Sequence, residues 1–127
     1  MADTVHTFLN YIDGAWVPCL LGSTFDNLNP ADTRDVVGRF QASGPADAEA
    51  AVQAAQKAFD GWRRMPIGKR AKMLNDAAAY LEQNAVQFAK ELTREEGKQF
   101  AQAKDEFLRS AQTFRFYATE GQTYGGE

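Results

Sequence analysis

The feature that most constrains the fold is a single change in the spacing of apolar residues, near Ser43. Before this point, apolar residues form short runs separated by turn residues, which is typical of short strands. After it, apolar residues recur every three or four positions over long stretches, which is typical of amphipathic helices. This order predicts an α/β fragment in which an N-terminal β-hairpin or meander is followed by three amphipathic helices.

Turn signals divide residues 8–41 into short strands. Asp13-Gly14, between two apolar runs, predicts a tight hairpin because both residue types tolerate positive φ. Asn29-Pro30-Ala31-Asp32 predicts a second turn. We expect a β-meander over residues 8–41. Its strands would be Phe8–Ile12, Ala15–Val17, Thr24–Leu28 and Val36–Gln41.

Three helices are expected over residues 44–121, the first of them opened by the start signal Ser43-Gly44-Pro45. Gly61 and Pro66 mark the far end of this first helix. The apolar row that ends at Trp62 predicts a buried tryptophan beside two solvated arginines.

Pro66 also opens the second helix, in which Asn84 is a candidate break. Gly97 is the expected left-handed residue after its last turn, with Lys98 near the negative end of the helix dipole. The third helix carries Phe100, Phe107 and Phe114 on one face, which we expect to be core, and it ends in the glycine-rich tail Gly121–Glu127.

Composition places the chain among ordinary folded proteins. With 127 residues, 44% apolar and 24% charged, it is close to the globular average. No repeat, low-complexity tract or linker interrupts the pattern, so no domain boundary is expected within residues 1–127.

The charge pattern argues against nucleic acid as a partner. The net charge is −3, and Lys and Arg are spread among acidic residues without forming a basic stripe. Residues 1–7 contain no basic segment, and no long apolar run follows them, so the sequence indicates neither a secretory signal nor a membrane span. We therefore expect a cytoplasmic protein.

Few residues of the chain are suited to catalysis. Cys19 is the single cysteine and His6 the single histidine, which excludes an internal disulfide, a zinc ligand set and a cysteine–histidine pair. His6 is expected in a frayed terminus, and no cation or helix start near Cys19 in the sequence would activate its thiol. The Gly-Lys pairs at Gly68-Lys69 and Gly97-Lys98 lack the remaining residues of a phosphate-binding loop.

Several segments, in order along the chain, resemble the aldehyde dehydrogenase family. They are Tyr11–Val17, Phe25–Ala31, Asp35–Gly38, Ala51–Arg63, Arg70–Leu81, Leu92–Lys98, Phe116–Ala118 and Tyr124–Glu127. Leu92–Lys98 is the most specific, because the family commonly has a Thr, an acidic residue and Gly-Lys there. Gln99 replaces the proline that usually follows. The resemblance covers the chain from Phe8 to Glu127.

This resemblance implies that the chain is the N-terminal part of the NAD(P)-binding domain of such an enzyme. In the family, a cysteine thiolate attacks an aldehyde, hydride passes to NAD or NADP, and a carboxylic acid is released. The residues for these steps would lie downstream of Glu127, so no catalytic or cofactor-binding residue is expected in this chain. The parent enzyme would be a homo-oligomer, either a dimer or a tetramer.

The resemblance also implies part of a monovalent-cation site. Many family members hold Na⁺ or K⁺ with backbone carbonyl oxygens before the Asn-Pro turn and an acidic side chain before Gly-Lys. The matching positions are Asn27, Leu28 and Glu95. Oxygen ligands suit hard cations, but three are too few to complete a site.

Within the family, Asn29–Thr33 and Val36–Gly38 are similar to bacterial α-ketoglutaric semialdehyde dehydrogenases, which implies a semialdehyde substrate. A different interpretation remains open. The chain could be a freestanding helical interaction module whose apolar helix faces dock to another protein, without enzymatic activity.

Overall fold

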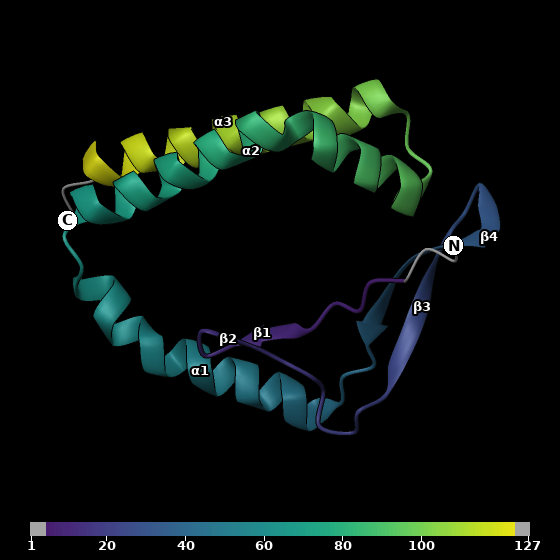
Figure 1. The fold of residues 1–127 in the computed structure, drawn as a ribbon. Coiled ribbons are helices and arrows are strands. Elements are labelled where there is room, and N and C mark those ends of the chain that lie inside the picture. The colour runs from purple at the N-terminus through teal and green to yellow at the C-terminus, as the bar shows by residue number, and fades with distance from the viewer. Residues whose placement is uncertain (1–4, 124–127) are drawn as a thin grey trace. The chain divides into compact units, whose positions relative to one another are not determined.

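The structure, a computed structural model, describes residues 5–123 (Figure 1). Within that range, four strands precede three helices, which confirms the predicted order. The strands are β1 (Asn10–Ile12), β2 (Ala15–Val17), β3 (Thr24–Asn29) and β4 (Asp32–Gln41). The helices are α1 (Pro45–Arg64), α2 (Ile67–Glu96) and α3 (Phe100–Thr123). The motif Tyr124–Glu127 lies outside the described residues.

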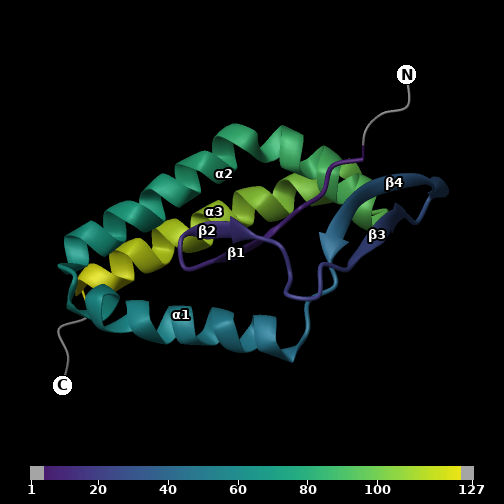
Figure 2. The same ribbon diagram turned by 60° about the horizontal axis from the view of Figure 1, so that its bottom comes forward.

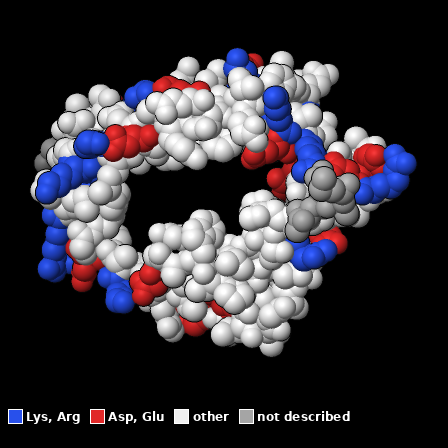
Figure 3. All heavy atoms as spheres, viewed as in Figure 1, with Lys and Arg blue, Asp and Glu red and all other residues white. Residues whose placement is uncertain are grey.

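The chain divides into two compact units, one up to Gly61 and one from Trp62 onward. The division falls within α1 and not in a linker, so the absence of a domain boundary in residues 1–127 stays a prediction. No helix between residues 5 and 123 combines the length and hydropathy needed to cross a bilayer. On the face seen in Figure 3, Lys and Arg side chains lie near Asp and Glu side chains.

The β1–β2 hairpin forms as the Asp-Gly signal predicts. Asp13 and Gly14 adopt φ values of 50° and 82°, the left-handed region that a two-residue turn of this kind requires. Tyr11 pairs with Trp16 across the two strands, and their ring centroids are 5.1 Å apart. This cross-strand aromatic contact adds to the hairpin's stability.

The strands form two separate two-stranded sheets, β1–β2 and β3–β4, and residues 8–41 are therefore not one continuous meander. The segment before β1 runs alongside β4. Phe8 donates its N–H to the carbonyl of Arg39 at 2.8 Å, and Arg39 donates to the carbonyl of His6 at 2.9 Å. The expectation of a frayed terminus at His6 is wrong, because these backbone hydrogen bonds tie it to β4.

Helix α1 begins at Pro45, as the start signal predicts, but it continues past Gly61 to Arg64. A single glycine costs a helix only about 1 kcal/mol, which the remaining turns offset. Trp62 is 41% exposed, so the prediction that it is buried is wrong. Asp47 is buried at the start of this helix, whereas the apolar residues Val52, Phe59 and Trp62 of α1 are exposed.

Helices α2 and α3 pack side by side and antiparallel (Figures 1 and 2). Their buried residues are all alanine. On α2 they are Ala71, Ala78, Ala85 and Ala89, and on α3 they are Ala103, Ala111 and Ala118. The spacing of seven or eight residues between most of them keeps one narrow strip of each helix in contact with the other. A methyl side chain allows the two backbones to approach closely.

This alanine contact corrects the expected core of α3. Phe100 is 42% exposed and Phe114 is 37% exposed, so neither is the core residue that we predicted. Phe107 is half-buried against Phe88 of α2, with ring centroids 5.3 Å apart. The two rings are half-buried and in contact with one another, whereas the alanines between the helices are almost completely buried.

The candidate break at Asn84 is also wrong, since α2 is continuous from Ile67 to Glu96. The side-chain amide of Asn84 donates to the carbonyl of Tyr80 at 2.8 Å and so stays within the helix. Across the pair, Arg115 of α3 forms a two-point hydrogen-bonded ion pair with Glu82 of α2, at 2.6 Å and 3.1 Å. The Arg115 guanidinium lowers the pKa of the Glu82 carboxyl.

Enlarging a residue in the alanine contact should separate the helices. We expect Ala78→Leu to destabilise the α2–α3 pair by about 1–3 kcal/mol, because a close-packed interface cannot absorb three added carbons. Ala78 is fully buried, whereas Ala101 on α3 is exposed. Ala101→Leu is therefore the matched control and should change stability by less than about 0.5 kcal/mol. Urea unfolding followed by circular dichroism measures both, and equal effects would contradict the assignment of the contact.

Candidate functional site

The three residues predicted to be ligands of a monovalent cation, Asn27, Leu28 and Glu95, do not all lie in the same unit. Asn27 and Leu28 are adjacent on β3, where the pairing with β4 is irregular: Asn27 pairs with Gly38 but Leu28 pairs with Val36. Such an irregularity redirects carbonyl groups away from the regular ladder. Glu95 is exposed near the end of α2. The structure therefore brings Asn27 and Leu28 together and holds Glu95 in the other unit.

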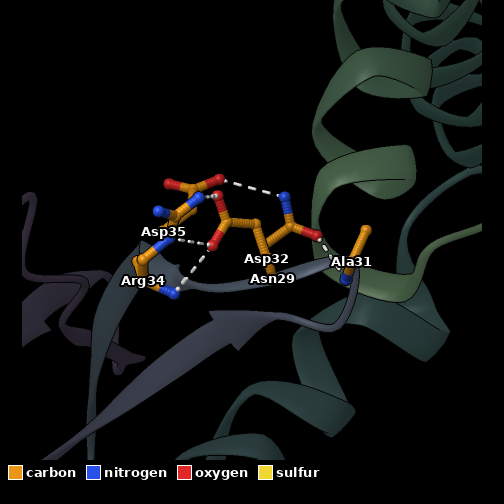
Figure 4. A network of polar contacts seen from close by, with 5 residues as sticks. All are labelled: Asn29, Ala31, Asp32, Arg34 and Asp35. Carbon is orange, nitrogen blue, oxygen red and sulfur yellow. Dashed lines mark hydrogen bonds and ion pairs between the residues drawn. The ribbon is translucent and has the colours of Figure 1, made fainter.

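The turn after β3 is stabilised by its own side chains (Figure 4). The Asn29 side chain accepts a hydrogen bond from the Ala31 N–H at 2.9 Å and donates to Asp35 at 3.1 Å. Asp32 accepts two hydrogen bonds from the Arg34 guanidinium, at 2.8 Å and 2.9 Å, and these lower the pKa of Asp32. These polar groups fix the shape of the turn through hydrogen bonds with one another.

The loop that contains Cys19 is held by buried polar contacts. Cys19 is 3% exposed, and its thiol donates to the carbonyl of Ser23 at 3.0 Å. The Cys19 N–H donates to the side-chain carbonyl of Gln41 at 3.0 Å. The side-chain nitrogen of Gln41 in turn donates to the backbone carbonyl of Phe8 at 2.9 Å. Gln41 therefore joins two loops to β4. A thiol enclosed in this way favours a structural role over a nucleophilic one.

Asp47 organises the start of α1, and sequence reasoning missed it. It is 6% exposed, and its carboxylate accepts one N–H from Gly44 at 2.8 Å and another from Leu20 at 2.9 Å. An acidic residue three positions after the residue that caps a helix commonly reaches back in this way. The signal was present as Gly44-Pro45-Ala46-Asp47, but the additional bond to Leu20 has no local signature.

The end of α2 matches its sequence signal. Gly97 has φ 78° and donates its N–H to the carbonyl of Thr93 at 2.9 Å, which confirms the left-handed cap. Lys98 contacts Glu106 of α3 at 2.8 Å and Glu96 at 3.3 Å, and its side chain is only 22% exposed. These contacts raise the pKa of Lys98, with the hydrogen bond to Glu106 as the largest cause and the hydrogen bond to Glu96 as a smaller one. The sequence placed Lys98 at the helix end but did not indicate its partner on α3.

Two buried polar atoms lack a hydrogen-bond partner within residues 5–123. They are the Arg70 Nε on α2 and the Thr93 Oγ1 near the end of the same helix. Leaving a buried donor unpaired costs about 1–3 kcal/mol, so each needs an explanation. The spacing of apolar residues in the sequence cannot identify such atoms, because it predicts which face of a helix is apolar and not which side-chain atoms are buried.

The described residues offer no phosphate-binding loop. Gly68 and Lys69 lie in the first turn of α2, and Gly97 and Lys98 lie directly after its last turn. Between residues 5 and 123, no three His, Cys, Asp or Glu side chains gather into a metal-binding group.

Comparison with known proteins places these features in a family. Residues 16–127 match the family model described as "Aldehyde dehydrogenase family". Over 122 residues, 38% are identical to an alpha-ketoglutaric semialdehyde dehydrogenase of Bacillus subtilis, with 96% of this chain and 25% of that protein covered. Over 111 residues, 39% are identical to the human 2-aminomuconic semialdehyde dehydrogenase, with 87% of this chain and 22% of that protein covered.

The fold is similar to that of solved structures. An NAD-dependent aldehyde dehydrogenase from Sinorhizobium meliloti superposes with a TM-score of 0.91 at 28% identity, covering 98% of this chain and 25% of that one. The chain thus spans about a quarter of the length of the relatives it matches.

Removing one acceptor from the carboxylate that caps α1 should loosen the loop around Cys19. We expect Asp47→Asn to destabilise the N-terminal unit by about 1–3 kcal/mol, because an amide cannot accept both the Gly44 and Leu20 N–H groups with its two polar atoms. The control is Glu49→Gln, which removes the same charge from an exposed position on the same helix. Thermal unfolding measures both. Equal midpoints for the two variants would show that the buried contacts of Asp47 contribute little.

Proposed function

The chain belongs to the aldehyde dehydrogenase family, and we propose that it is the N-terminal part of an NAD(P)-dependent enzyme that oxidises an aldehyde to a carboxylic acid. The observation that carries this proposal is the match of residues 16–127 to the family model. Two relatives, at 38% and 39% identity, are named as semialdehyde dehydrogenases. A semialdehyde is therefore the substrate class we favour.

The role proposed for these 127 residues is that of a scaffold. The Cys19 thiol is buried and donates a hydrogen bond to a backbone carbonyl, and the His6 carbonyl accepts a backbone hydrogen bond from β4. Neither is arranged as a nucleophile with a neighbouring base. NAD or NADP, the aldehyde and the catalytic groups would be handled by other parts of the parent enzyme. We also propose that this parent is a cytoplasmic homo-oligomer, either a dimer or a tetramer, as the family resemblance implies.

One observation favours the alternative of a freestanding interaction module. Val52 and Phe59, seven residues apart on one face of α1, are 51% and 59% exposed. An uncovered apolar row is suited to docking against a partner helix. The two candidate functions differ in whether a longer polypeptide with dehydrogenase activity exists.

The scaffold assignment predicts a clear division of activity. We expect the 127-residue chain to give no heat of NAD⁺ or NADP⁺ binding in titration calorimetry, and the full-length parent to reduce one of them when a semialdehyde is added. Measurable affinity of the short chain for either nucleotide would contradict the assignment. A reading frame that stops after Glu127 would favour the interaction module instead.

Cys19→Ser in the full-length parent is the matched control for that experiment. We expect its turnover to stay within about twofold of the wild type, since the enclosed thiol is replaced by a hydroxyl that can make the same hydrogen bond. A loss of turnover in a correctly folded variant would place Cys19 in the chemistry.

We further propose that the carbonyl oxygens of Asn27 and Leu28 and the carboxylate of Glu95 contribute to a site for Na⁺ or K⁺. The irregular pairing at Asn27 and Leu28 and the oxygen-only donor set support this assignment. These three ligands need others from elsewhere in the parent enzyme.

The cation proposal predicts a stability that depends on the counter-ion. Replacing K⁺ and Na⁺ with tetramethylammonium should lower the melting temperature of the full-length parent, because a bound ion stabilises the folded state. Glu95→Gln should weaken this dependence, whereas Glu91→Gln, one turn earlier on an exposed part of α2, should preserve it. A melting temperature that is independent of the cation in all three proteins would refute the site.

A further inference from the structure

We draw no further inference here: the strongest candidate, the groove between the β1–β2 hairpin and the alanine-rich side of α1, which is lined among others by Tyr11, Ile12, Ala51, Ala55 and Ala58, carries nothing because it is a stripe of small residues and nothing in the described part of the chain shows what covers it.

Discussion

The close contact between the alanine strips of α2 and α3 is the constraint on which the C-terminal unit depends. Ala78, Ala89, Ala103 and Ala111 are fully buried, whereas no large side chain among the described residues is. Methyl groups allow the helices to approach closely, and the half-buried rings of Phe88 and Phe107 meet across the two helices. The same geometry brings Glu82 within reach of Arg115 and Lys98 within reach of Glu106. An alanine core buries little area, which makes these flanking contacts more important to stability.

The N-terminal unit is held together by hydrogen bonds to a few covered polar side chains. Gln41 joins the segment at Phe8 to the loop at Cys19, and Asp47 joins that loop to the first turn of α1. Buried polar groups of this kind specify one arrangement, because each unmade bond would be costly. Apolar side chains such as Trp16 and Phe59 are 68% and 59% exposed. A unit built in this way fixes its backbone by hydrogen bonds while leaving its large apolar residues exposed.

The chain belongs to the aldehyde dehydrogenase family and spans about a quarter of the length of the relatives it matches. Caps and buried acceptors shape each unit from within. Cys19, the single cysteine, takes part in these contacts, since its thiol donates to the carbonyl of Ser23. Both units also carry exposed large apolar residues, among them Val52 and Phe59 on α1 and Tyr80 on α2.

Local sequence determined the elements, because their causes lie within a few residues: the hairpin turn at Asp13-Gly14, the helix start at Pro45 and the left-handed cap at Gly97 all form where the residues indicate. Family membership was likewise readable, since it depends on ordered motifs. The tertiary structure alone decided which residues are buried. Periodicity identifies an apolar face, but alanine and phenylalanine satisfy it equally, and only the distance between two helices decides which of them fits. For the same reason, the partners of Asp47 and Lys98 and the unpaired Nε of Arg70 emerged only when segments distant in sequence were packed together.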